Sequence, residues 1–292
     1  MLQKYINLKS NKVELTPVIV FPDNPKVICL EPEFISPQDG AEKQDCELNA
    51  AERWIGRNAF SAEKNIIILG DDLFSREPFC KPALSKGFHF VLVCRPDSHK
   101  TLYEYVDFFE KNNDIKTLSF RKWNGRFHEL FNFRYCNALP IKDGEHTLQV
   151  NWVEITITNA STGIISYKNS FITDFELNSN SVPFIVQAGR ARWKVENENN
   201  NILKTKGYHL EHNYGHGDKY LSSIMVTLNI LAFSAHTFLE FVDLTYRAVR
   251  QKSAARKRFF HDFNTLTKYL LFDSWQHLIN FMSTQLKIPN SA

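Results

Sequence analysis

The chain has 292 residues, with 43% hydrophobic residues, 13% aromatic residues and a formal net charge of +3 at pH 7. This length is enough for one large domain or two modest ones, and the apolar content supports a real core. The net charge is too small to indicate a nucleic-acid partner by itself, so the distribution of charge along the chain matters more.

The cysteines and the apolar segments argue against two further classes of protein. Five cysteines are scattered along the chain without CxxC spacing, which favours buried reduced thiols over disulfides or a cysteine-based zinc site. The N-terminal stretch MLQKYINLKS lacks the apolar run of a signal peptide, and the most apolar segment, residues 222–244, is interrupted by polar side chains. We therefore expect residues 222–244 to form a buried helix rather than a membrane span, in a cytoplasmic protein with no membrane partner.

Residues 17–113 have the pattern of an α/β fold. Two short strands are expected in residues 17–31, joined at a Pro-Asp-Asn-Pro turn, and a helix follows with Trp54 on its apolar face. Residues 66–69 are four apolar residues that lead into Gly70, which is typical of a strand buried on both faces. Two helices and another buried strand follow. This order predicts an α/β sheet with an antiparallel edge hairpin.

The pattern changes after residue 116. Residues 117–175 alternate between apolar and polar, and Asn124-Gly125 stands between two such runs as a strong hairpin signal. From about residue 185 onward the chain is expected to be helical again. We therefore divide the chain into four regions, at 1–116, 117–184, 185–246 and 247–292.

Two segments carry acidic residues that suggest chemistry. Asp71 and Asp72 directly follow the buried strand, where active groups of open α/β sheets gather, and a divalent metal is the usual compensation for such a pair. The alternative is that one of them only caps the next helix. Further on, Arg192, Glu196 and Lys204 stand at helical spacing, which fits either a functional carboxylate framed by cations or an exposed helix with ordinary ion pairs.

These features together resemble a known family. The Gly-Asp-Asp run, the all-β stretch and the Arg-x3-Glu of Arg192 and Glu196 look like bacterial insertion-sequence transposases of the Asp-Asp-Glu class, in the group with a Tyr-x2-Arg-x3-Glu-x6-Lys signature. Gly189 stands at the tyrosine position, and Lys204 falls one residue late. The stretches GYHLEHNYGHG and PQDGAEKQDCE also look like one subgroup of these transposases, so the resemblance spans most of the chain.

The resemblance implies a fold and a reaction. The fold is a ribonuclease-H-like catalytic core with an all-β insertion and a C-terminal helical region. The reaction is metal-dependent cleavage and transfer of DNA strands at insertion-sequence ends, with carboxylates that hold two Mg²⁺ ions. By this resemblance Asp71 and Glu196 are the second and third catalytic acids and metal ligands, with Asp72 as the reserve ligand. Arg192 and Lys204 would contact DNA phosphates.

The family's first acid has no obvious counterpart. The resemblance places it on a first strand that precedes the hairpin at 17–31, but residues 1–16 contain no Asp and no alternating apolar run. We therefore expect a copy that is truncated at its N-terminus, lacks the first strand and is catalytically impaired. The alternative is that the sheet is threaded differently, with Asp39 or Asp45 completing the site.

Histidines and a basic cluster lie in the last third of the chain. His212 and His216, with His209 before them, have no nearby cysteine to complete a zinc site, so we expect them to face DNA or order a loop. Residues 247–258 carry six basic groups and no acid. Of these, three adjacent basic residues are the expected phosphate contacts: Arg256, Lys257 and Arg258. The alternative is a solvated helix face.

The leading hypothesis is thus an impaired transposase that acts on DNA near the bacterial nucleoid, with a possible homodimer in a synaptic complex. Two other classes stay open. One is a DNA-binding remnant without catalysis that keeps only the basic surfaces. The other is an unrelated magnesium-dependent nuclease whose site is formed by Asp71, Asp72 and Glu196.

Overall fold

The computed structural model describes residues 4–7, 10–11, 14–22, 24–35, 45–57, 66–210, 212 and 220–288. The chain divides into two compact units. Unit 1 consists of Met1–Pro25 and Leu30–Val195, and unit 2 consists of Lys26–Cys29 and Glu196–Ala292.

The main sheet has nine strands among the described residues, in the order β5-β4-β1-β7-β8-β12-β11-β10-β9. Their bounds are β1 Lys4–Asn7, β4 Val18–Phe21, β5 Asn24–Cys29, β7 Ile66–Gly70, β8 His89–Val93, β9 Lys116–Trp123, β10 His128–Pro140, β11 Gln149–Asn159 and β12 Ile165–Thr173. Three short strands form a second sheet: β2 Ser10–Asn11, β3 Glu14–Leu15 and β6 Glu33–Phe34. Every residue of β7 is buried, as predicted from its run of apolar residues.

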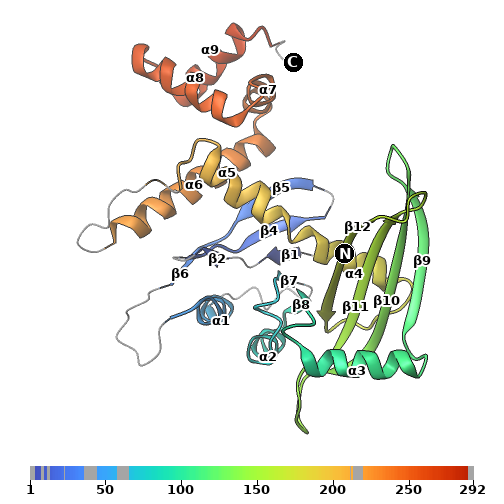
Figure 1. Ribbon diagram of the computed structural model, residues 1–292. Coiled ribbons are helices and arrows are strands. Elements are labelled where there is room, and N and C mark those ends of the chain that lie inside the picture. Colours follow the sequence, from blue (N-terminus) through green and yellow to red (C-terminus); the bar gives the residue numbers. More distant parts are fainter. Residues whose placement is uncertain are drawn as a thin grey trace. The chain divides into compact units, whose positions relative to one another are not determined.

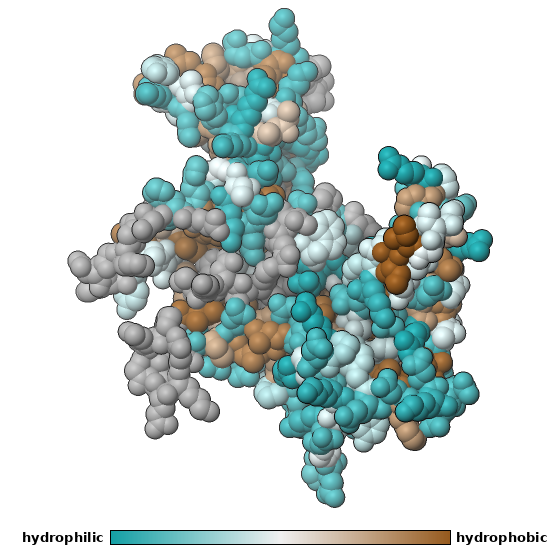
Figure 2. Space-filling model, in the orientation of Figure 1, coloured by the Kyte–Doolittle hydropathy of each residue, from teal (hydrophilic) through white to brown (hydrophobic). Residues whose placement is uncertain are grey.

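Four helices belong to unit 1 in the part of the chain that is described: α1 Glu47–Arg57, α2 Glu77–Ser85, α3 Lys100–Lys111 and α4 Ser181–Ala191 (Figure 1). Helix α1 forms where predicted, since its apolar residues recur on one face and bury Trp54 and Ile55 in the core. Helix α3 has a narrow buried face, with Leu102 and Val106, and the surface over it is mostly hydrophilic in the view of Figure 2.

A strand precedes Pro17, so the expectation that the sheet lacks its first strand is wrong. Strand β1 pairs in parallel with β7, from Lys4 opposite Ile66 to Asn7 opposite Leu69, and antiparallel with β4. Ile6 is 2% exposed. A four-residue strand with a neighbour on each side is held by two hydrogen-bonded ladders, so it does not need the long alternating run that the sequence lacks.

The β-rich stretch continues the main sheet. Strands β9 to β12 form an antiparallel meander, and β12 pairs antiparallel with β8 (Figure 1). The predicted hairpin is confirmed at the β9–β10 turn, where Asn124 Oδ1 accepts hydrogen bonds from the backbone N–H groups of Arg126 and Phe127, each 3.0 Å long. Gly125 has a φ of +97°, which explains the glycine at this position.

Apart from Lys26–Cys29, which belong to β5, unit 2 is mainly helical in its described residues, as the sequence predicts. Its helices are α5 Asn201–Thr205, α6 Leu221–Val242, α7 Leu244–Lys252, α8 Arg256–Tyr269 and α9 Trp275–Gln285. The Asp243 side chain accepts a hydrogen bond from Tyr246 N and caps α7, and the Ser274 side chain caps α9 through His277 N. Residues of α7, α8 and α9 form the core of this unit: Tyr246, Val249, Phe259, Leu278, Ile279 and Met282.

The expectation that residues 222–244 form a buried helix is wrong in its burial. They comprise most of α6, the cap residue Asp243 and the first residue of α7, but only 17% of the most apolar stretch of α6 is buried. Its buried residues are Ile230, Phe233 and Thr237. Helix α6 carries apolar side chains on more than one side, and the side with these three residues packs within the chain. Among the described helices, α6 is the one that is long and apolar enough to cross a membrane.

Candidate functional site

The first predicted acid lies in a tight turn at the end of β7. Asp71 is half-buried. Its Oδ1 accepts a hydrogen bond of 3.1 Å from Leu73 N, and its carbonyl oxygen accepts one of 3.2 Å from Phe74 N. A Cβ on the preceding Gly70 would lie 2.9 Å from the Leu92 side chain, so glycine allows this turn to pack against β8. Asp71 thus stands at the carboxyl edge of the sheet, as predicted.

The second carboxylate holds a neighbouring loop. Oδ1 of Asp72 accepts hydrogen bonds from Arg95 N at 2.6 Å and from Ser98 Oγ at 2.7 Å. Both donors lie between β8 and α3, so Asp72 fixes the entry to α3 rather than capping α2, which follows it in the chain. This engagement leaves Asp72 less suited to be a metal ligand than Asp71.

A buried histidine completes this network. His99 is 4% exposed, and its Nε2 lies 2.7 Å from Ser75 Oγ and 3.7 Å from Asp72 Oδ1. Burial lowers the pKa of His99, which favours the neutral ring. A hydrolase triad requires the serine and the carboxylate on opposite ring nitrogens, whereas here both approach Nε2, and Ser75 is fully buried. The arrangement is a structural clamp and not a nucleophile.

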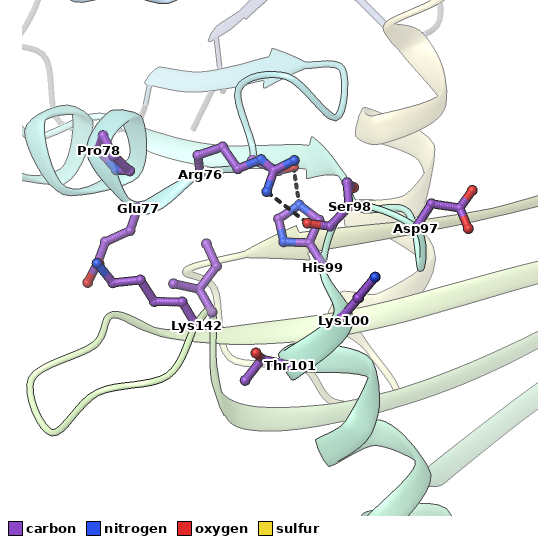
Figure 3. Close-up of a pocket in the computed structure, with 11 residues that line it drawn as sticks. Arg76, Glu77, Pro78, Asp97, Ser98, His99, Lys100, Thr101 and Lys142 are labelled. Atoms are coloured by element: carbon purple, nitrogen blue, oxygen red, sulfur yellow. Dashed lines mark hydrogen bonds and ion pairs between the residues drawn. The ribbon is translucent and has the colours of Figure 1, made fainter.

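A cavity of about 440 Å³ adjoins the clamp, at the N-terminal ends of α2 and α3. Figure 3 shows Arg76, Lys100 and Lys142 on its rim. Arg76 Nη1 donates a hydrogen bond of 2.8 Å to the Ser98 carbonyl oxygen, which joins the two helix starts. The first turn of α3 presents backbone N–H groups, and such a position favours an anion. In α2, by contrast, Pro78 has no N–H, and the Phe79 and Cys80 N–H groups donate to the Arg76 carbonyl oxygen.

Two acids, Glu77 and Asp97, line the cavity, and Glu77 is already compensated. Glu77 forms ion pairs with Lys142 and with Lys81, and it accepts a hydrogen bond of 2.9 Å from Leu148 N. The contacts with Lys142 and then Lys81 lower the pKa of Glu77 to about 2. Lys100, by contrast, makes no ion pair or hydrogen bond within the described part of the chain. With Arg76, Lys100 and Lys142 against Glu77 and Asp97, the residues that line the cavity have a net charge of +1.

The third predicted acid lies in an unusual helix. Helix α4 ends at Ala191 with Arg192 as its C-cap, Glu196 falls in a π-helix at Val195–Asn200, and Lys204 is in α5. The expectation of one regular helix through these three residues is therefore wrong. The run of asparagines lowers α-helical propensity there, and π-helical turns are frequent at functional sites.

Gly189 stands where the transposase signature has a tyrosine, and the structure has no room for a tyrosine side chain at this position. A Cβ at this position would lie 2.7 Å from the Phe171 ring, so the aromatic ring of β12 occupies the space that a tyrosine side chain would need. Glu196 belongs to unit 2 and Asp71 to unit 1, and the expected approach of these two acids stays a prediction.

Asn7 lies at the same edge of the sheet as Asp71. It ends β1 opposite Leu69, two residues before Asp71. Among the described residues, no three His, Cys, Asp or Glu side chains are grouped so that they could hold a metal ion. Asp45, an alternative first acid, pairs with Arg53 at 2.8 Å beside α1. Asp39, the other alternative, lies outside the described residues.

The predicted DNA-contacting residues divide into internal and exposed groups. The Arg256 side chain is 16% exposed and lies 3.3 Å from Glu240, with Tyr208 Oη at 3.2 Å. It supports the interior of unit 2, which argues against a phosphate contact. Lys257 and Arg258 are exposed.

The two predicted histidines are less informative. His212 is exposed, and its backbone N–H donates to the His209 carbonyl oxygen at 2.9 Å. His216 lies outside the described residues.

Sequence reasoning missed the basic cavity. Arg76, His99 and Lys142 are far apart in the chain, so no local pattern of residues brings them together. The sequence signal for this cavity is a serine and a histidine just before α3, together with a proline and a basic residue at the start of α2. Comparison of the chain with family models and with curated proteins gives no match.

Proposed function

We propose that this protein binds DNA as a transposase-type protein with a ribonuclease-H-like core, and that its metal-dependent strand cleavage is impaired. Its partner would be double-stranded DNA in the bacterial cytoplasm, and the ion of the intact chemistry would be Mg²⁺. The resemblance of the sequence to insertion-sequence transposases suggests this class, and three features of the structure are consistent with it.

The first is the order of the strands. In β4-β1-β7-β8, β1 is central, β4 is antiparallel to it, and β7 and β8 are parallel to it. An acid that follows β7 then lies at the carboxyl edge of the sheet beside the end of β1. Asp71 occupies that position.

The observation that carries the impairment is the register of β1. Asn7 stands at the end of β1, opposite Leu69, where the transposase family would place its first acid. A neutral amide oxygen binds Mg²⁺ less strongly than a carboxylate, because it supplies no negative charge. The described residues therefore do not complete a two-ion site.

Two basic surfaces support DNA binding. Lys257 and Arg258 are exposed at the start of α8, and Arg258 is opposed by a single acid, Asp262, at 4.0 Å. The cavity fits a phosphate of the DNA backbone, since Arg76, Lys100 and the N-terminus of α3 lie together there and outweigh the acid Asp97.

The test combines binding and cleavage. The full chain is incubated with supercoiled plasmid in Mg²⁺ or Mn²⁺, and binding to a fluorescent duplex is measured by anisotropy. We expect binding without cutting. Asn7→Asp should produce nicked or linear plasmid, and the double variant Asn7→Asp with Asp71→Asn should not.

Three results would count against the proposal. The absence of salt-dependent DNA binding by the folded chain would reject DNA as the partner. Rapid cutting by the unaltered chain would reject the impairment. Cutting by Asn7→Asp that persists after Asp71→Asn would reject the assignment of the site. The nuclease alternative predicts that Asp72→Asn abolishes cutting, whereas the proposed site predicts that this variant loosens the entry to α3.

A further inference from the structure

Helix α6 carries an exposed apolar stripe along its whole length. Its large members have high exposed fractions: Leu221 40%, Ile224 54%, Leu228 51%, Leu231 62%, Phe238 64% and Val242 57%. Ala235, in the same stripe, is also exposed. We call these seven residues the α6 seam. Large apolar side chains at such exposure normally mark a binding surface.

The spacing of the seam is that of a coiled coil. Its positions are separated alternately by three and four residues from Leu221 to Val242, which is the a/d repeat of three heptads. An ordinary surface helix has one apolar stripe, and that stripe faces its own core. Helix α6 has two apolar stripes. Phe233 and Ile230, at 2% and 5% exposure, already pack within the chain on another side of the helix than the seam.

We propose that the α6 seam is a homodimer interface, in which two copies of this chain pair α6 against α6. The heptad repeat argues for a second copy, because a seam of alternating spacing is complementary to an identical seam through a two-fold axis. The transposase hypothesis only allows a homodimer; the assignment of its interface to α6 rests on the spacing and exposure of this helix and not on the proposed function.

The residues that flank the seam allow self-pairing. The positions beside it along the helix, equivalent to e and g of the heptad, are Met225, Thr227, Ala232, Ser234, Leu239 and Phe241. None of them is charged, so two identical copies meet no like-charge repulsion at these positions. The one acid of the helix, Glu240, is on the inner side and 13% exposed.

The size of the surface is also adequate. The exposed parts of the seven side chains amount to roughly 600 Å² for each copy, before the flanking residues are added, against about 800 Å² for each partner in a stable interface. Phe241 and Leu244, at 38% and 60% exposure, extend the apolar area at the C-terminal end. Helix α6, with 22 residues, is about 33 Å long, which is enough for three heptads of contact.

The test is the mass of the full chain in solution. Sedimentation equilibrium at micromolar concentration should give twice the chain mass of 34.0 kDa. The double variant Leu228→Glu/Leu231→Glu should raise the dimer dissociation constant about 100-fold or more, because two central apolar side chains become repelling charges. Its far-UV circular dichroism and its resistance to proteolysis should match those of the unaltered chain. The control is Ser222→Glu, which adds a charge to the same helix outside the seam and should leave the dimer intact.

A charge-swap experiment keeps the proposal falsifiable if the glutamate variant is poorly folded. Leu228→Glu and Leu228→Lys chains should each be weakened as homodimers but should form a heterodimer when mixed. A folded monomer for the unaltered chain overturns the proposal, as does a glutamate variant that still dimerises. Two other occupants give distinct results, and either would overturn it. If unit 1 covers the seam, the chain is a monomer and Leu228→Glu destabilises it. If a membrane surface covers the seam, the chain partitions into lipid vesicles and is monomeric in detergent.

Discussion

Glu240 should be the single most important charge in unit 2. Its side chain is 13% exposed and lies 3.4 Å from Lys26, 3.4 Å from Arg250 and 3.3 Å from Arg256. Glu240→Gln keeps the shape of the side chain but removes the negative charge that separates three cations. Removal of one partner from a buried ion pair costs about 3–5 kcal/mol. Since Lys26 is partly exposed, at 28%, we expect the lower end, about 3 kcal/mol.

The assay should report unit 2 alone, because a melting curve of a chain with two units mixes their transitions. Native-state amide exchange, measured by mass spectrometry on peptides from α6, α7 and α8, reports the opening of this unit. Glu240→Gln should increase its opening equilibrium on the order of 100-fold, and added salt should restore part of the loss. Asp262→Asn is the matched control, because its contact with Arg258 is exposed and 4.0 Å long. A change in Glu240→Gln no larger than in this control would refute the reasoning.

Two further predictions concern the same unit. Burial, with smaller contributions from Arg256 and Arg250, lowers the pKa of His236 from 6.5 to about 4. Below pH 6.5 the unfolded chain therefore takes up a proton that native His236 does not. The free energy of unfolding should fall by up to about 3 kcal/mol between pH 6.5 and pH 4, as measured by amide exchange. An equally steep fall in the His236→Gln variant would mean that other groups cause it. For DNA binding, Lys257→Ala/Arg258→Ala should reduce the slope of log affinity against log salt by up to about 1.8 without loss of fold, whereas Arg256→Ala should instead destabilise unit 2. An unchanged slope in the double variant would mean that these two side chains are only solvated.

Local patterns predicted the elements whose causes are local. The run of apolar residues before Gly70 gave a buried strand, and Asn124-Gly125 gave a hairpin, because four consecutive apolar side chains and a left-handed turn residue each restrict the backbone directly. The predicted α/β class and the helical C-terminal region follow from the same kind of signal. Asp71 was placed correctly at the end of its strand, since it directly follows that run.

The errors fall where the deciding contacts are distant in the chain. Strand β1 is held by ladders on both sides, and no window of its own residues shows that. The burial of α6 was overestimated because hydropathy counts apolar side chains without saying which of them find a partner within the chain. The basic residues of 247–258 looked equivalent in the sequence, yet Arg256 is drawn inward by Glu240 while Lys257 is exposed. Such differences depend on one distant carboxylate.

The pairing of β12 with β8 has a consequence for how the chain reaches its fold. Strand β8 is made early, but its partner on one side is β12, so Leu92 cannot meet Ile172 until the whole meander has left the ribosome. Throughout that interval β8 presents an open apolar edge, which is the kind of edge that pairs with other chains. The β-rich stretch therefore also protects the edge of β8 by pairing with it. A shortened chain without residues 117–175 should aggregate rather than fold as a smaller core.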